Sequence, residues 1–110
     1  MITRQRLVIG AGNKGDTGPA VYGKLVQLRW LAGTDTGVNV TTAVLPKVGD
    51  TGEGYNAHVR VVNTDFDTGF TDITKRYLAG ERIRVKTSND TGVATPNHTG
   101  GTMYAWFETN

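Results

Sequence analysis

The chain has 110 residues, which suits one domain and is too short for large nucleotide-binding or barrel enzymes. Threonine (17), glycine (15) and valine (12) are its commonest residues, and this bias towards β-branched and turn-forming residues argues against a helical bundle. The formal net charge of +2 gives little support to nucleic-acid binding, and the lack of cysteine excludes disulfides, Cys-based zinc sites and thiol catalysis.

The predicted elements begin with an N-terminal part, residues 1–20, that we expect to be a partly extended arm and a glycine-rich loop. This arm contains one short strand at residues 7–9. Longer strands are predicted where apolar and polar residues alternate with a period of two. They cover residues 21–31, 38–45, 55–62, 82–87 and 102–108.

The same alternation predicts which side chains face the core. The longest strand has apolar even positions, Tyr22, Val26, Leu28 and Trp30, but its odd positions also include Val21, Leu25 and Leu31, so partial covering of both faces is an open alternative. The later strands would bury Tyr55, Ala57 and Val59, then Ile83 and Val85, and finally Met103, Ala105 and Phe107. His58 and Arg60 would then point away from the core.

Residues 72–79 fit two structures. Asp72 suits a helix N-cap and Gly80 a C-terminal cap, so a helix of two turns is one alternative, and a strand is the other. In either case residues 1–110 are predicted to form a single all-β domain. The expected fold is an antiparallel β-sandwich or a jelly-roll-like small barrel of about six to eight short strands.

The triplet Asp-Thr-Gly occurs five times, beginning at Asp16, Asp35, Asp50, Asp67 and Asp90. It is the catalytic triplet of retroviral-type aspartic proteases, which are also small and all-β. In those enzymes an apolar pair precedes the aspartate, and no copy here has one. We therefore interpret the triplets as turns closed by a left-handed glycine, and we assign no catalytic residue.

The segment that contains Asn63, Asp65 and Asp67 has oxygen-bearing side chains at the spacing of a calcium loop. An EF-hand also needs glycine at its sixth position and glutamate at its twelfth, where this chain has Thr68 and Thr74. A polar loop is the preferred interpretation, and no metal or cofactor is assigned.

Two strand faces and one loop supply candidate contacts with a partner. Tyr104 and Trp106 alternate with the inward residues of the last strand, which is typical of a protein interface, a sugar-binding platform or a strand covered on both faces. Basic residues on the strand at 82–87 could meet solvent or an acidic partner surface. The candidate contact residues are Lys14, Arg82, Arg84, Lys86, Tyr104 and Trp106.

Several stretches of the chain resemble small all-β virion proteins of tailed bacteriophages, most of all capsid decoration (cement) proteins. They are GPAVYGKLVQLRW from Gly18, DTGVNV from Asp35, VLPK from Val44, ERIRVK from Glu81 and MYAWF from Met103.

This resemblance implies a non-enzymatic protein that binds the major capsid protein on the outer capsid surface, often as a trimer, without cofactor, nucleic acid or membrane. The alternatives are a phage tail tube protein, a head–tail completion protein or a carbohydrate-binding β-sandwich module. No apolar stretch suggests a signal peptide or a membrane span, so we expect assembly into the virion in the host cytoplasm.

Overall fold

The computed structural model describes residues 1–9, 15–33, 39–60, 64–68, 76–88 and 101–109, and this part of the chain is all-β. Its seven strands are β1 (Ile2–Ile9), β2 (Gly15–Ala32), β3 (Asn39–Leu45), β4 (Tyr55–Arg60), β5 (Phe66–Asp67), β6 (Tyr77–Ser88) and β7 (Gly101–Glu108). They form one antiparallel sheet in the order β1-β7-β2-β6-β3-β4, with β5 paired to β2. The predicted antiparallel all-β fold is confirmed.

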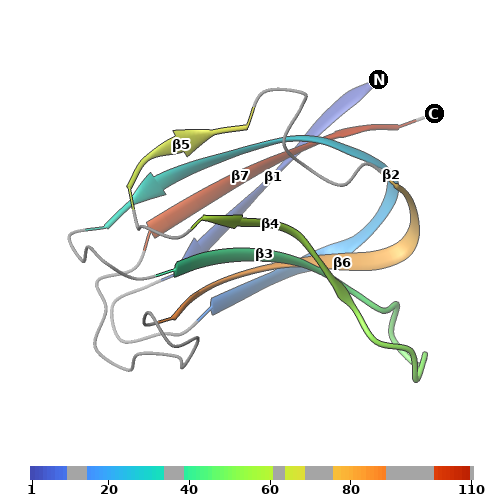
Figure 1. The fold of residues 1–110 in the computed structure, drawn as a ribbon. Coiled ribbons are helices and arrows are strands. Elements are labelled where there is room, and N and C mark those ends of the chain that lie inside the picture. The colour runs from blue at the N-terminus through green and yellow to red at the C-terminus, as the bar shows by residue number, and fades with distance from the viewer. Residues whose placement is uncertain (10–14, 34–38, 61–63, 69–75, 89–100, 110) are drawn as a thin grey trace.

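The sheet bends over on itself because β2, 18 residues long, belongs to two halves of the fold. Its first part pairs with β6, and its second part pairs with β7. Figure 1 shows β5, β7 and β1 on one side of the bend and β6, β3 and β4 on the other. Strands that switch sheets in this way make the corners of sandwiches and small barrels, and the core lies between the two halves.

A β-bulge in β2 changes which face of the strand is buried. The register with β7 shifts between Leu25 and Gln27, so one extra residue is inserted there. Burial accordingly moves from the odd positions Val21 and Leu25 to even positions after the bulge. Residues of both faces are therefore buried, and of the apolar even positions Val26, Leu28 and Trp30 are in the core while Tyr22 is 65% exposed.

Strand β6 begins earlier than predicted. Its first residues, Tyr77 to Ala79, pair with Lys24 to Tyr22 of β2, so the helix considered for residues 72–79 does not form there; residues 72–75 lie outside the described part. β6 then changes phase after Gly80, whose φ of +99° favours glycine. Beyond it, Ile83 and Val85 are fully buried, as predicted.

The N-terminal segment is sheet rather than arm. β1 pairs with β7 along all eight of its residues, and Leu7 and Ile9 reach the core. Residues 15–20, expected in a loop, form the start of β2. The predicted strand at residues 7–9 is confirmed as part of β1, but the loop expected at residues 15–20 is wrong, because pairing with distant partners stabilises both segments as strands; residues 10–14 lie outside the described residues.

Strand β4 also contains a bulge, and its predicted faces are reversed after the bulge, whereas Tyr55 before it packs against the core as predicted. Its register with β3 shifts beside Thr42, where His58 lies opposite that buried threonine and Arg60 lies opposite buried Val40. His58 and Arg60 are therefore on the inner side of the strand. Val59, predicted to be buried, is 49% exposed, while Ala57 is buried as predicted.

The core combines residues from both halves of the sheet, with Trp30 at 0% exposure as its largest side chain. Met103, Ala105 and Phe107 of β7 are buried, as their alternation predicts. Gly101 packs directly against the Trp30 ring, where an added Cβ would overlap with Cζ2. The first residue of β7 must therefore be glycine for Trp30 to keep its position.

Candidate interaction surface

The outer face of β1, β7 and the second part of β2 carries two rows of aromatic and basic side chains. Trp106 of β7 lies between Arg4 of β1 and Gln27 of β2. In the next row, Tyr104 lies between Arg6 and Arg29. Residues paired across antiparallel strands point to the same face, so we call these six residues, Arg4, Arg6, Gln27, Arg29, Tyr104 and Trp106, the Arg–aromatic face.

Packing holds the centre of this face in place. The rings of Tyr104 and Trp106 lie 6.2 Å apart at an angle of 37°. The Arg4 guanidinium carbon lies 4.8 Å from the Tyr104 ring centroid, at a cation–π distance. Gln27 Nε2 donates a hydrogen bond of 2.8 Å to Asp67 Oδ1, which ties the face to β5. A partner would therefore meet a largely preorganised surface.

Exposed apolar side chains surround the Arg–aromatic face. Ile2 and Val8 of β1 and Leu31 of β2 are on the same side of the strands, and all three are exposed. Tyr, Trp and Arg are enriched in protein interfaces, usually with apolar neighbours. The basic residues here are Lys24 and three arginines, against the carboxylates Glu108 and Asp67. The surface therefore suits a partner surface that is acidic.

The predicted basic residues of β6 lie on the other side of the molecule. Ile83 and Val85 of β6 and Met103 of β7 face the same core from opposite halves, so Arg84 and Tyr104 point away from each other. Arg82, Arg84 and Lys86 are half-buried rather than fully exposed.

Two of these basic residues make contacts within the protein itself. An Nη atom of Arg82 donates to the Pro46 carbonyl at 3.1 Å, and Arg84 lies between Thr17 and Ala43 in the sheet. The candidate contact residues therefore separate into two groups: Tyr104 and Trp106 on one face, and Arg82, Arg84 and Lys86 on the other. Lys14 lies outside the described residues.

Sequence reasoning missed the arginines that flank the aromatic pair. Arg4 and Arg6 alternate along β1, and Arg29 lies in the longest strand, but the three are far apart in the chain. Only the register of β1, β7 and β2 brings them together. The sequence signal that could have found them is the alternation of Arg4 and Arg6, but these residues fall in the segment that the sequence predicts to be an extended arm.

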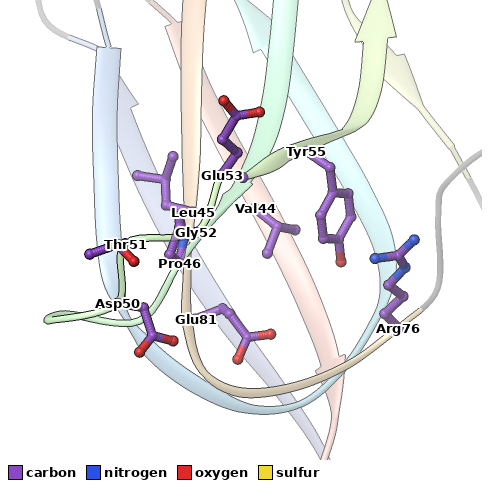
Figure 2. Close-up of a pocket in the computed structure, with 11 residues that line it drawn as sticks. Val44, Leu45, Pro46, Asp50, Thr51, Gly52, Glu53, Tyr55, Arg76 and Glu81 are labelled. Atoms are coloured by element: carbon purple, nitrogen blue, oxygen red, sulfur yellow. The ribbon is translucent and has the colours of Figure 1, made fainter.

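A hollow of about 380 Å³ opens between the β3–β4 connection and the start of β6 (Figure 2). Tyr55, Arg76 and Glu81 line it, together with Asp50 and Glu53. The Arg76 guanidinium carbon lies 4.5 Å from the Tyr55 ring centroid, and the buried Tyr55 hydroxyl has no hydrogen-bond partner among the residues that the structure describes.

Burial raises the pKa of Tyr55 above its ordinary value of 10.0; Arg76 lowers this pKa and Glu81 raises it. Among the described residues that line the hollow there is no histidine. The charged side chains and the Tyr55 hydroxyl of the hollow could hold a polar ligand by charge and hydrogen bonding.

The proposed calcium-loop residues that the structure describes hold β5 against β2. Asp65 Oδ1 accepts a hydrogen bond of 2.7 Å from the Ala32 amide, and Asp67 accepts one from Gln27. Thr68 extends the attachment, because its backbone amide donates to the Leu28 carbonyl at 3.0 Å and its hydroxyl accepts from the Leu28 amide. These carboxylates therefore have structural partners; Asn63 lies outside the described residues.

The Asp-Thr-Gly triplets do not share one structure. Asp16 to Gly18 lie inside β2, and Asp50 closes a turn in which its amide donates to the Lys47 carbonyl. The left-handed glycine of that turn is Gly49, with φ of +96°, whereas neither Gly18 nor Gly52 has a positive φ. The interpretation as turns closed by the triplet's own glycine is wrong for these two copies. Asp35 and Asp90 lie outside the described residues.

In the part of the chain that the structure describes, no three His, Asp or Glu side chains gather closely enough to hold a metal ion. No helix there could cross a membrane. Comparisons with protein-family models, curated proteins and solved structures found no match.

Proposed function

We propose that this protein is a non-enzymatic structural component of a phage virion that binds the major capsid protein on the outer surface of the shell and stabilises it. The resemblance of several sequence stretches to decoration proteins suggests this class. The structural observation that supports the proposal, and that names the residues of the contact, is the Arg–aromatic face. Residues of this kind, fixed by sheet pairing and ringed by apolar side chains, are typical of the centre of a protein interface.

The arrangement of the rings favours a protein partner over a sugar. A sugar-binding platform needs an aromatic ring face open to the ligand. The Arg4 guanidinium lies over the Tyr104 ring, and Trp106 is tilted by 37° to Tyr104, so the two rings do not form a flat platform. Arginine beside tyrosine and tryptophan is common in protein interfaces and suits an acidic patch on the shell.

Sedimentation of the protein with expanded capsids that lack it tests this proposal. We expect the wild-type chain to sediment with the shells and Trp106→Ala to lose about tenfold or more in affinity, as central interface aromatics do. Tyr22→Ala is the matched control, since Tyr22 is an exposed aromatic of the half of the sheet formed with β6. A wild-type chain that stays in the supernatant while the capsids sediment would reject the capsid role.

The oligomeric state is a separate part of the proposal. Resemblance to decoration proteins suggests a homo-oligomer, with a trimer favoured. Sedimentation equilibrium in the absence of capsids measures this state directly. A monomer that trimerises only on the shell fits the proposal, whereas long rings or tubes would instead favour the tail tube alternative.

A further inference from the structure

The outer edge of β1 has backbone groups that no described strand pairs with. β1 is the end strand of the sheet, and among the described strands only β7 pairs with it. The Met1 carbonyl accepts a hydrogen bond from the Thr109 amide, which shows that odd-numbered residues of this segment bond towards β7. In an antiparallel ladder the even-numbered residues then direct their N–H and C=O groups to the other side.

One of these even positions is already satisfied within the chain. The Val8 amide donates a hydrogen bond of 2.9 Å to Asp16 Oδ2, and this contact closes the edge at the C-terminal end of β1. The open stretch is therefore Ile2 to Arg6, with the backbone groups of Ile2, Arg4 and Arg6 facing outwards.

The open stretch has the geometry of a strand ready for pairing. Its eight pairs with β7 run without a register shift, so the strand is regular, and it contains no proline. Exposed edges of this kind pair readily with an extended segment of another chain. We propose that the edge of β1 from Ile2 to Arg6 is a β-augmentation site, where an extended segment of a partner protein with acidic side chains at alternate positions adds a strand.

The charges on this edge define the partner. Arg4 and Arg6 are exposed and lie on the outer face of β1. A segment paired to the edge places every second side chain beside these arginines, so carboxylates two residues apart meet both of them. The alternate side chains of the segment point the other way and are not required to be charged.

The same charges disfavour pairing of the β1 edge with the β1 strand of a second copy of this chain. If two β1 strands paired antiparallel around Arg4, the two Arg4 side chains would be directly opposite each other. A shift by one pair would place Arg4 opposite Arg6. Like charges directly opposite on neighbouring strands are destabilising, so both of these self-pairings are poor.

This inference depends on the geometry of β1 and on its two arginines, and not on binding to a capsid, so it goes beyond the proposed capsid role and can hold even if that role is rejected. The probe is a capped peptide of about nine residues in which glutamate alternates with threonine. Added to the ¹⁵N-labelled full chain, it should slow the exchange of the Arg4 and Arg6 amide hydrogens with solvent. Amides of the odd residues, which already bond to β7, should change little.

Two substitutions at one position separate the backbone contribution from the charge. Arg4→Ala removes the guanidinium and keeps the amide hydrogen, and we expect peptide affinity to fall about two- to fivefold. Arg4→Pro also removes the outward N–H while leaving the bonds to β7 in place, and it should lower affinity by about a further tenfold. A lysine–threonine peptide is the charge control and should bind more weakly than the glutamate peptide.

Three results would overturn the inference: no protection of Arg4 and Arg6 by the glutamate peptide, equal affinity of Arg4→Pro and Arg4→Ala, or equal binding of the lysine peptide. Should Arg4→Pro fail to fold, the amide exchange of the wild-type chain decides the question. Failure of the capsid role gives a different pattern, in which the peptide binds to β1 but the protein does not sediment with capsids.

Discussion

The two end strands of the sheet, β1 and β4, are exposed to solvent in different ways. β1 is regular along its eight residues and is attached to the core by Leu7 and Ile9. β4 has six residues and a bulge, and of its side chains only Ala57 is fully buried. The bulge and the short length make β4 a poor template for another strand.

Besides its bulge and short length, β4 is also protected from pairing with another strand by contacts with β5. Phe66 of β5 stacks on His58 with ring centroids 4.9 Å apart, and the Arg60 guanidinium carbon lies 5.9 Å from the Phe66 centroid. These contacts join the edge of one half of the sheet to the other half. Among the described residues, the corresponding covering of β1 is limited to Asp16, which bonds to Val8, and Gln5, whose amide donates to the Pro19 carbonyl. The protein thus closes one edge and leaves most of the other available.

The largest expected difference between the two edges is in their contribution to stability. Leu7→Ala removes a side chain that is 2% exposed, and we expect it to lower the free energy of unfolding by about 2–5 kcal/mol. Val59→Ala on β4 should cost about 0.5 kcal/mol, because Val59 is half exposed. Urea denaturation measures both values, and equal losses would contradict the view that β1 is the more firmly anchored edge.

A pair of proline variants tests which side of β1 is open. Thr3→Pro removes an N–H that bonds to β7, and it should destabilise the fold by about 2 kcal/mol relative to Thr3→Ala. Arg4→Pro removes an outward N–H, and it should cost less than about 1 kcal/mol relative to Arg4→Ala. Urea midpoints of the four variants measure the contrast, and a reversal would mean that the even residues face β7.

Removal of the cover over β4 should have a smaller effect. Phe66→Ala deletes the stack on His58 in a half-buried position, and we expect a loss of about 1–2 kcal/mol. Hydrogen exchange should also become faster at the amides of β4 while those of β1 stay unchanged. Unchanged exchange in β4 would show that its bulge alone protects this edge.

Local alternation predicted the parts of this fold whose strands are regular. Ile83 and Val85 in β6 and Met103, Ala105 and Phe107 in β7 are buried as their period of two requires. Alternation failed in β2 and β4, since each contains a bulge that shifts the phase of the side chains. A bulge is set by pairing with a neighbouring strand, which local sequence does not reveal.

Local sequence also predicted only part of the Arg–aromatic face. Tyr104 and Trp106 were identified from their own strand because they alternate with core residues. Arg4 and Arg29 could not be placed beside them, because the contact depends on the registers of two separate strand pairs. Asp16 was likewise assigned to a turn, whereas its carboxylate accepts a hydrogen bond from β1 and so limits the open edge.

The smallest expected effect is a pH dependence that arises at the start of β4. Burial raises the pKa of Tyr55 above 10.0, so the folded protein keeps this phenol protonated at a pH where the unfolded chain has begun to lose the proton. The unfolded state then binds fewer protons than the folded state, and stability falls as pH rises from about 10 through the folded pKa. Below about pH 9, where the phenol is protonated in both states, Tyr55 contributes no slope.

Tyr55→Phe isolates this effect because it removes the titrating hydroxyl and keeps the ring on which Arg76 stacks. We expect the urea midpoint of the wild-type chain to drop more steeply than that of the variant between about pH 9 and about pH 11. The difference should be absent near about pH 8, where the phenol is protonated in both states. Parallel decline of the two proteins across the whole range would mean that the Tyr55 hydroxyl is as well solvated in the folded β4 edge as in the unfolded chain.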